Sequence, residues 1–399
     1  MKVLHLCTFS SGGAANAAVR LHQGLMNENV ISNFLYLKGE PSATEQLVIF
    51  DDYATGLVSK IQDFFNGNWF HYRVKANKRL FEIYSFPKSK YKDLAQHPLV
   101  NQADIIHLHW VSNFIDYPSF FKKLDKPVVW TLHDMNPFRG GFHYEEDAKR
   151  SSYLQEYERT LLNIKKKALA GFKQSVTFVA PSKWLLEESL HSEIGRTYPH
   201  YLIPYGIDVD VFHAYSQREV RTELGIAEHE KVLLFVSENV DNYRKGFDLL
   251  LQALPSLVDE FADLKIVAIG RGSDAIPEYV KHLGMIHEQQ YLAKIYAMAD
   301  AVVLPSREDN LPNVMIESLA CGTPVVAFSV GGMRDVIRSG INGILAEDVS
   351  AAGLSKALSA LLVNLNVYDR ASIQRDAHEL FSLNVQAERY IDLYRHILS

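Results

Sequence analysis

The fold is decided by the stretch Ala301-Val-Val-Leu-Pro-Ser-Arg-Glu-Asp-Asn-Leu-Pro-Asn-Val-Met-Ile-Glu-Ser-Leu-Ala-Cys-Gly-Thr-Pro-Val-Val-Ala-Phe328. The short apolar runs at its two ends predict buried strands over 301–304 and 325–328. Between them, apolar residues at helical spacing predict a helix over 313–320, which Gly322 and Pro324 end. Two parallel strands joined by a helix form a βαβ unit, so this stretch indicates an α/β fold with parallel sheets.

Two carboxylates follow the first of these strands. Asp309 lies in the loop, and Glu317 lies eight positions later on the predicted helix. Ligands of parallel sheets bind beyond the carboxyl ends of the strands, where a helix N-terminus offers free N–H groups to an anion. The spacing alone is equally compatible with two solvated carboxylates, because most Asp and Glu side chains lie on protein surfaces.

The composition is that of an ordinary globular protein. The 399 residues are 47% hydrophobic and 22% charged, and the formal net charge is −6, which argues against a nucleic-acid partner. The length suits two or three domains. We expect Cys7 and Cys321 to be reduced, buried thiols, since they are far apart in the sequence.

We expect a cytoplasmic protein, with a peripheral position on the inner face of the membrane as one option. The N-terminal residues are predicted to form a strand, and they lack the basic segment and the apolar run of a signal peptide. The sequence also contains no run of about 18 uninterrupted apolar residues, which a membrane-spanning helix would need.

A loop of small residues follows the first predicted strand, Val3–Cys7, and contains Gly12 and Gly13. Strand, glycine-rich loop and helix form an arrangement that cradles phosphate groups, although the GxGxxG fingerprint is not present. A plain tight turn between strand and helix is the alternative.

Two later strands deliver histidines to their carboxyl ends. His107 and His109 lie in the predicted strand 104–110, and His133 lies at the end of the strand 127–134. A lone histidine at such a position is more often structural, but two strands that direct histidines to one sheet edge favour a functional site there. We expect His107 and His109 to line the wall of a cleft, and Arg139 in the following loop to shape an acceptor pocket.

The segment 57–94 combines many aromatic side chains with an excess of Lys and Arg. It could form helices that pack on the sheet with a basic outer face. Alternatively, it could contact an anionic membrane or a lipid-linked substrate, because aromatic rings bury at the interface while Lys and Arg reach the phosphates.

The ordered set of motifs resembles the retaining glycosyltransferases of family 4, which have the GT-B fold. Pro305-Ser306, Asp309, Glu317-Ser318 and the run Gly322-Thr-Pro-Val-Val326 fall in register with the signature of that family. Where the family usually has Glu, this chain has Asp309. Where the family usually has Gly-Phe-Gly and one further residue, this chain has residues 310–313. One of these, Pro312, has no N–H to offer a phosphate.

The resemblance implies two Rossmann-like βαβ domains that face each other across a cleft. The N-terminal, acceptor-side domain would span 1–208, and the C-terminal, nucleotide-sugar-binding domain would span 209–385. A C-terminal helix over about 386–399 would cross back to the first domain.

The resemblance also implies where the donor diphosphate binds. Lys245-Gly246 matches the Lys-Gly of the family, whose lysine binds this group. The family has an arginine one residue after the preceding strand, where this chain has Glu238. Because a carboxylate cannot replace a guanidinium, we predict that Arg244 supplies the second positive charge. A solvated loop arginine is the alternative.

The remaining roles are likewise implied by the resemblance. Glu317 would bind the ribose hydroxyls, Asp309 the outer hydroxyls of the sugar, and His133 would lie near the reacting carbon. Backbone groups of Met285 and Ile286 would contact the base. The other expected donor contacts are made by Gly12, Gly13, Asn310, Leu311 and Asn313.

The expected activity is transfer of a sugar from a nucleotide-sugar donor to a glycan or lipid-linked acceptor, with retention of configuration, in cell-surface polysaccharide synthesis. We expect no cofactor and no obligatory metal, because the basic loop with Arg244 and Lys245 would take the role of a metal at the diphosphate. The alternatives are a nucleotide-sugar epimerase or phosphorylase on the same fold, and a non-catalytic subunit that binds nucleotide sugars.

Overall fold

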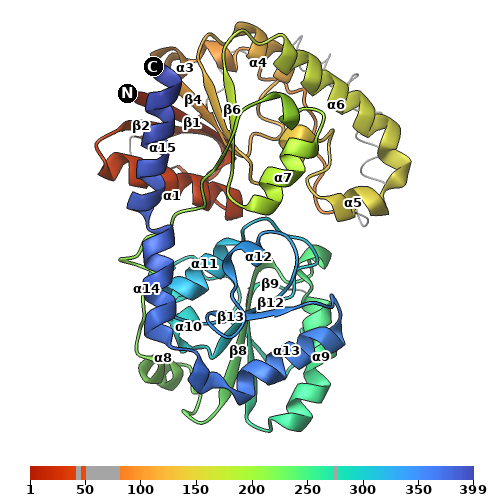
Figure 1. Cartoon of the computed structure of the whole chain (residues 1–399), viewed down its shortest axis with the longest axis vertical. Helices are drawn as coiled ribbons and strands as arrows, with labels where there is room; N and C mark the ends of the chain where they lie inside the picture. Colours follow the sequence, from red (N-terminus) through yellow and green to blue (C-terminus); the bar gives the residue numbers. More distant parts are fainter. Residues whose placement is uncertain (42–45, 51–80, 273–275) are drawn as a thin grey trace. The chain divides into compact units, whose positions relative to one another are not determined.

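The computed structural model describes residues 1–41, 46–50, 81–272 and 276–399, and they form two compact units. The first unit comprises Met1–Pro204 together with Ala387–Ser399, and the second comprises Tyr205–Gln386. Each unit is a parallel sheet covered by helices (Figure 1). The predicted fold class, α/β with two Rossmann-like domains, is therefore confirmed.

The sheet of the first unit has the strand order β3-β2-β1-β4-β5-β6-β7, and all neighbouring strands are parallel. Its strands are β1 (Lys2–Phe9), β2 (Ile31–Lys38), β3 (Leu47–Ile49), β4 (Ile105–Leu108), β5 (Val128–Thr131), β6 (Val176–Ala180) and β7 (His200–Leu202). Its helices are α1 (Gly13–Asn27), α3 (Pro98–Gln102), α4 (Tyr117–Lys123), α5 (Glu145–Arg150), α6 (Gln155–Ala170), α7 (Lys183–His191) and most of α15 (Leu383–Leu398).

Alternation along the strands gives the first sheet two buried faces. On one face, Val3 of β1, Ile105 of β4 and Val129 of β5 pack against α1 and against Tyr390 and Tyr394 of α15. The alternate residues of the same strands form the opposite face and pack against α4, α6 and α7. Helices thus cover both faces, as is usual for a parallel sheet.

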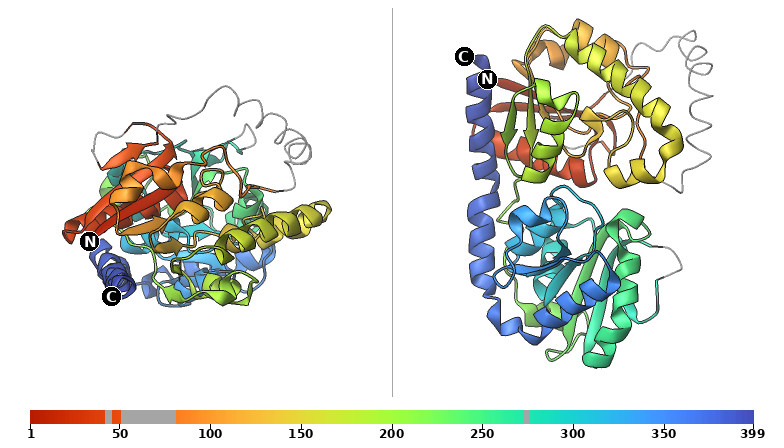
Figure 2. Two further views of the ribbon diagram at one scale, coloured as in Figure 1. Left: turned by 90° about the horizontal axis from the view of Figure 1, so that it is seen from above. Right: turned by 45° about the vertical axis from the view of Figure 1, so that its right-hand side comes forward.

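The sheet of the second unit has the order β10-β9-β8-β11-β12-β13 and is also parallel. Its strands are β8 (Lys231–Asn239), β9 (Leu264–Arg271), β10 (Val280–His282), β11 (Ala301–Leu304), β12 (Val325–Phe328) and β13 (Gly343–Ala346). Helices α9 (Phe247–Glu260) and α13 (Ala351–Val363) pack on each other against this sheet (Figure 2). The other helices are α8 (Gln217–Glu223), α10 (Gln289–Met298), α11 (Asn313–Ala320), α12 (Met333–Val336) and α14 (Arg370–Phe381).

The stretch 301–328 forms the predicted elements with the predicted bounds, namely β11, α11 and β12. The segment 209–224 is polar and loosely patterned, as a linker is, yet it contains α8. Ser216 makes this helix possible, because its side chain accepts a hydrogen bond from the Glu219 amide and so caps the first turn.

Most of the aromatic and basic segment 57–94 lies outside the described residues, since 57–80 are not described. The described part contains Phe81 and Tyr84, whose rings pack around Phe142. Among the helices of the described residues, none is long and apolar enough to cross a membrane.

Candidate active site

The loop between β11 and α11 presents a buried carboxylate to two cations. Asp309 is 5% exposed, and one of its oxygens lies 2.6 Å from Nζ of Lys245. Its other oxygen lies 3.3 Å from the Arg244 guanidinium and accepts a hydrogen bond from the Asn310 amide at 3.1 Å. The structure thus brings together Asp309, Arg244, Lys245 and Asn310, all of which were predicted site residues.

Arg244 is held in this place by its surroundings. It lies in a short 3-10 turn, Tyr243–Lys245, that follows β8, and it is 7% exposed. Its guanidinium donates to the Glu308 carbonyl at 3.0 Å, and its own carbonyl accepts from the Arg307 amide at 2.8 Å. The alternative of a solvated loop arginine is therefore wrong. Glu238, at the position where the resemblance expects an arginine, pairs with Arg271 on the surface.

The two cations determine the charge state of Asp309. Burial alone would raise the pKa of its carboxyl group, but Lys245 and Arg244 outweigh burial and hold the pKa below its usual range. The carboxylate is therefore ionised at neutral pH. Two cations around one buried anion form a site whose positive charge is suited to an added anion such as a diphosphate.

Glu317 lies in the middle of α11 and is 5% exposed. Its carboxylate accepts a hydrogen bond from the Tyr296 hydroxyl of α10 at 2.8 Å. Tyr296 was not predicted as a site residue, because no pattern in the sequence relates α10 to α11. Near the same helix start, Leu311 is buried and Asn313 is the first helical residue.

The predicted base-binding residues lie in the chain that follows β10. Met285 is exposed and Ile286 is partly buried, and neither belongs to a strand or helix. The loop is fixed by a backbone hydrogen bond of 2.9 Å from the Gly270 amide to the Gly284 carbonyl, and His282 contacts the Gly270 carbonyl at 2.7 Å. Main-chain groups of Met285 and Ile286 are thus held near the end of β9.

The other predicted site residues belong to the first unit. Gly12 is the N-cap of α1 with φ of 97°, and its carbonyl accepts from the Asn16 amide at 2.8 Å. A positive φ of this kind favours glycine. Gly13 is the first residue of α1, and a Cβ placed on it would meet nothing within 4 Å. The space beside this helix start is thus open.

His133 follows β5 at the carboxyl edge of the first sheet and is 8% exposed. Its Nε2 lies 3.1 Å from Nδ1 of His109. Burial lowers the pKa of His133 to about 4, although the neighbouring Asp134 opposes this shift. The ring is therefore neutral at pH 7, so it carries one proton and is a hydrogen-bonding group rather than a cation.

Asp134 organises the loop that follows His133. Its carboxylate accepts from Trp110 Nε1 at 2.9 Å and from the Asn136 amide at 2.8 Å, and it lies 2.6 Å from His143 Nδ1. Nε2 of His143 contacts the Ser85 hydroxyl at 2.8 Å. This has the connectivity of a Ser-His-Asp triad, but Ser85 is 1% exposed, so the contacts serve to fix the loop.

Arg139, which was predicted to shape an acceptor pocket, pairs with Glu145 of α5. Its carbonyl and that of Asn136 accept hydrogen bonds from the ammonium of buried Lys165, at 2.9 and 2.5 Å. Burial lowers the pKa of Lys165 to about 7. The loop is therefore anchored from α6 by a side chain that the sequence analysis did not single out.

His107 does not line a cleft, whereas His109 borders a small pocket together with His133 and Asp134. The exposed fractions of His107 and His109 are 0% and 2%, because both alternate with apolar residues on the sheet face that α15 covers. His107 contacts the Tyr394 hydroxyl at 2.6 Å and the Thr131 hydroxyl at 2.8 Å. His5 of β1 completes the group, with its Nδ1 at 2.9 Å from His109 Nε2.

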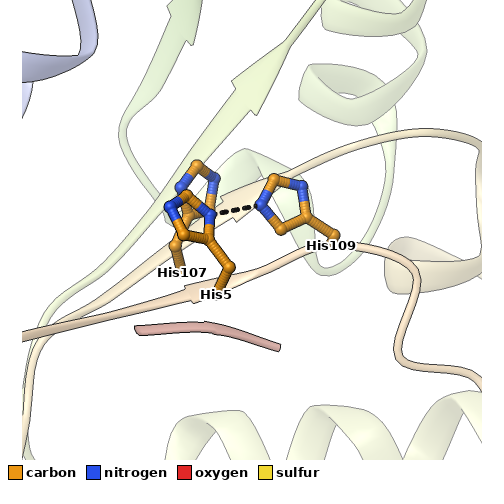
Figure 3. A group of neighbouring side chains, drawn as sticks. All are labelled: His5, His107 and His109. Carbon is orange, nitrogen blue, oxygen red and sulfur yellow. Dashed lines mark hydrogen bonds between the residues drawn. The ribbon is translucent and has the colours of Figure 1, made fainter. Parts of the chain in front are cut away.

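His5, His107 and His109 lie close enough together to be considered as metal ligands. One nitrogen of each of His5, His107 and His109 lies within 4.8 Å of the others (Figure 3). However, both nitrogens of His107 and both nitrogens of His109 already have hydrogen-bond partners. Hydrogen bonds therefore account for the cluster.

Comparison with known proteins agrees with this architecture. The sequence model described as Glycosyltransferase Family 4 matches residues 11–211, and the one described as Glycosyl transferases group 1 matches residues 230–364. The glycosyltransferase MJ1607 of Methanocaldococcus jannaschii is 27% identical over 316 residues, which are 74% of this chain and 76% of that protein.

Two solved structures show the same fold at low sequence identity. Sucrose-phosphate synthase from Thermosynechococcus elongatus has a TM-score of 0.72 and 19% identity, and the match covers 100% of this chain and 99% of that one. HepE of Anabaena, in complex with UDP-glucose, has a TM-score of 0.67 and 15% identity, with 99% and 100% covered. Because the first family model spans 201 of the 399 residues, the chain belongs to glycosyltransferase family 4 and is a glycosyltransferase.

Proposed function

We propose that this glycosyltransferase uses a nucleotide-sugar donor, whose diphosphate binds at Arg244 and Lys245. The observation that carries the proposal is the pairing of buried Arg244 and partly exposed Lys245 with the buried carboxylate of Asp309, after β8 and before α11. HepE, a structural neighbour, was solved with UDP-glucose, which supports a donor of the same class.

The positive charges of Arg244 and Lys245 determine how the site would assist the transfer of the sugar. As the bond from the sugar to the diphosphate breaks, negative charge grows on the leaving phosphate oxygens, and fixed cations stabilise that charge. Asp309 already holds both cations in place, so little reorganisation is needed when a diphosphate arrives. In this proposal Asp309 also binds the outer hydroxyls of the sugar, and Glu317, oriented by Tyr296, binds the ribose.

The further parts of the proposal are retention of configuration, no obligatory metal, and a glycan or lipid-linked acceptor in cell-surface polysaccharide synthesis. Retention would follow from attack by the acceptor on the face that the leaving phosphate occupies. Donor and product anomers compared by NMR test this part, and an inverted product would refute it.

Contact with an anionic membrane is proposed for the basic and aromatic segment 57–94. Sedimentation with vesicles tests it: more protein should pellet with anionic than with neutral lipid at low salt, because Lys and Arg are attracted to anionic headgroups. Equal pelleting with both vesicle types would remove this part of the proposal.

The central experiment measures thermal stabilisation by nucleoside diphosphates. UDP, GDP or ADP at about 100 times its dissociation constant should stabilise the protein by about 2.7 kcal/mol. Lys245→Ala should lose most of this effect. The matched control is Lys265→Ala, which removes an exposed lysine of the same unit that pairs with Glu230, and it should respond like the wild type.

Measurements of donor binding and donor conversion also distinguish a glycosyltransferase from an epimerase and from a non-catalytic binding subunit. A glycosyltransferase consumes its nucleotide sugar quickly only when an acceptor is present, whereas an epimerase converts the donor alone. Stabilisation by the donor without any conversion, tested with lipid-linked acceptors, would indicate a binding subunit. No stabilisation by any nucleotide, or equal stabilisation of Lys245→Ala, would overturn the proposed diphosphate site.

A further inference from the structure

Arg307 connects three parts of the second unit that surround the proposed diphosphate site. It lies in the loop between β11 and α11, two residues before Asp309. Its side chain is 14% exposed, pairs with Asp248 in the first turn of α9, and contacts the turn 243–245. Arg307 was not predicted as a site residue, because the sequence does not show which elements a loop arginine contacts.

The guanidinium of Arg307 reaches the turn that carries Arg244 and Lys245. Its Nη1 donates to the Tyr243 carbonyl at 2.6 Å, and the planar group lies over the Tyr243 ring, 3.9 Å from the ring centroid. The backbone adds a further contact, since the Arg307 amide donates to the Arg244 carbonyl at 2.8 Å. One residue of the loop therefore binds two consecutive carbonyls of the turn.

The same guanidinium is oriented by a bidentate ion pair. Nη1 and Nη2 of Arg307 donate to the two carboxylate oxygens of Asp248 at 2.8 and 2.6 Å. These hydrogen bonds lower the pKa of Asp248 and raise the pKa of Arg307, so both groups are charged at neutral pH. The helix dipole also favours a negative charge in the first turn of α9. The position of Arg307 is thus fixed by a regular element of the fold.

The turn and the loop are also in direct backbone contact. Gly246 follows the turn with φ of +71°, and a Cβ placed on it would lie 1.9 Å from the Pro305 carbonyl oxygen. Arg244 crosses this contact from the turn to the loop, because its guanidinium donates to the Glu308 carbonyl at 3.0 Å. Arg307 crosses it from the loop to the turn. The two arginines therefore hold the two segments together from opposite sides of the contact.

The balance of charges distinguishes Arg307 from the neighbouring cations. Arg244 and Lys245 share the carboxylate of Asp309, so a net positive charge remains for an added anion. Arg307 is paired with the carboxylate of Asp248, to which both of its terminal nitrogens donate. Because this pair is neutral as a whole, it attracts a further anion weakly. The contacts therefore favour positioning of the cations that bind the diphosphate over direct binding by Arg307.

We propose that Arg307 is a positioning residue of the diphosphate site, which holds the turn 243–245 against the loop 305–309 and so keeps the cations of the turn in place beside Asp309. This inference rests on the proposed function, in which these cations bind the diphosphate of the donor. Cations that are held in place before the ligand arrives lose less conformational freedom on binding, and they stabilise developing charge without reorganisation.

Calorimetric titration with UDP, GDP and ADP tests the proposal. Arg307→Met keeps a side chain of similar length without the guanidinium, and it should raise the Kd of the nucleoside diphosphate by about ten-fold or more. Arg307→Lys keeps the charge but not the bidentate pair, so it should raise the Kd as well. The matched control is Arg338→Met, which removes an arginine of the same unit that pairs with Asp376. Wild-type affinity in Arg307→Met or in Arg307→Lys would overturn the proposal.

Asp248→Asn distinguishes positioning from direct binding, because it removes the charged partner of Arg307 while the arginine remains. If Arg307 positions the turn, the loss of this partner should weaken the binding of nucleoside diphosphate. If Arg307 bound the diphosphate itself, the released cation would bind it more tightly. Unchanged or tighter binding would therefore overturn the proposal. The side chain of Asp248 is 47% exposed, so this variant should fold even where Arg307→Met does not.

Hydrogen exchange followed by mass spectrometry gives a measurement that needs no ligand. The Lys245 amide donates to the Asn242 carbonyl at 2.9 Å, and the Gly246 amide donates to the Tyr243 carbonyl at 3.2 Å. Both amides should exchange faster in Arg307→Met, while the amides of β8 exchange as in the wild type. Unchanged exchange of the turn in Arg307→Met would contradict its role.

A double-mutant cycle with Lys245→Ala shows whether Arg307 acts through the turn. If it does, the loss of affinity in the double variant should be clearly smaller than the product of the two single losses. Losses that multiply would show independent action and would contradict the proposal. By contrast, a wild type that binds no nucleoside diphosphate, or wild-type affinity in Lys245→Ala, would refute the proposed function itself, and this inference with it.

Discussion

The Tyr394 hydroxyl lies 2.6 Å from Nδ1 of His107, and both side chains are fully buried in the first unit. Tyr394 belongs to α15, the last helix of the chain, and His107 belongs to β4, 287 positions earlier. On the same helix, Tyr390 reaches the Thr131 hydroxyl at 2.7 Å. The C-terminal residues are therefore attached to the first sheet by buried polar contacts as well as by apolar packing.

Tyr394→Phe should destabilise the protein by about 1–3 kcal/mol, because it leaves a buried nitrogen of His107 without its partner while the packing is kept. Denaturant unfolding measures the effect. Tyr201→Phe, which changes a tyrosine of β7 that is 37% exposed, is the control and should change the stability little. Equal effects of the two substitutions would show that the buried hydrogen bond contributes no stability.

Stability should fall as the pH is lowered from 7 to about 4. The folded-state pKa values of His5, His22, His107, His109 and His133 all lie below the ordinary value, mainly through burial. Between about pH 4 and 6.5 the unfolded chain therefore binds more protons, so acid favours unfolding. Each of these histidines contributes about 1.4 kcal/mol per pH unit in this window.

Denaturant unfolding at several pH values between 4.5 and 7.5 measures this slope. His22→Leu removes one of the five groups and should reduce the slope, since the pKa of His22 is lowered to about 4 in the folded protein. A free energy of unfolding that does not depend on pH in this range would show that these histidines are not held neutral.

Asp309→Asn should destabilise the second unit by about 3 kcal/mol, because it leaves Arg244 and Lys245 beside a neutral group. The stabilisation by Asp309 depends on pH for a different reason from that of the histidines, because ion pairs rather than burial lower its pKa. Folding lowers the pKa of Asp309. The ionised carboxylate therefore contributes its full stabilisation above the unfolded-state pKa of about 3.9, and this stabilisation disappears as the pH falls through the folded-state pKa. The difference between wild type and Asp309→Asn should therefore shrink only below about pH 4. A difference that shrinks at neutral pH would contradict this assignment.

Gly331→Ala should disturb the Asp309 loop. Gly331 has φ of +52°, and a Cβ placed on it would lie 1.8 Å from the Asp309 carbonyl oxygen, so the loop must move. Gly340→Ala is the matched control, because Gly340 has φ of +78° but a Cβ would meet nothing within 4 Å. Both substitutions incur backbone strain of about 1–2 kcal/mol. Only Gly331→Ala should also weaken the stabilisation by nucleoside diphosphate, and equal ligand responses would refute the role of this contact.

Much of the fold could be predicted from local patterns. The bounds of β11, α11 and β12 follow from an apolar run, a helical spacing and the two helix-ending residues Gly322 and Pro324. Short edge strands such as β3 and β7 could not be predicted in this way, because three residues carry too little periodicity. The helix α8 was missed because its polar pattern resembles that of a linker.

The sequence by itself determined that the chain is a glycosyltransferase with parallel sheets, since the order of its motifs is local information. It also indicated that Asp309, Lys245 and Arg244 belong to one site, although not that they form ion pairs. Only the tertiary structure decided that His107 and His109 are interior and that His5 contacts His109. Alternation along a strand shows which residues share a face, but whether that face is covered depends on a helix nearly 300 residues away. Contacts across such a separation are set by packing, which no local pattern encodes.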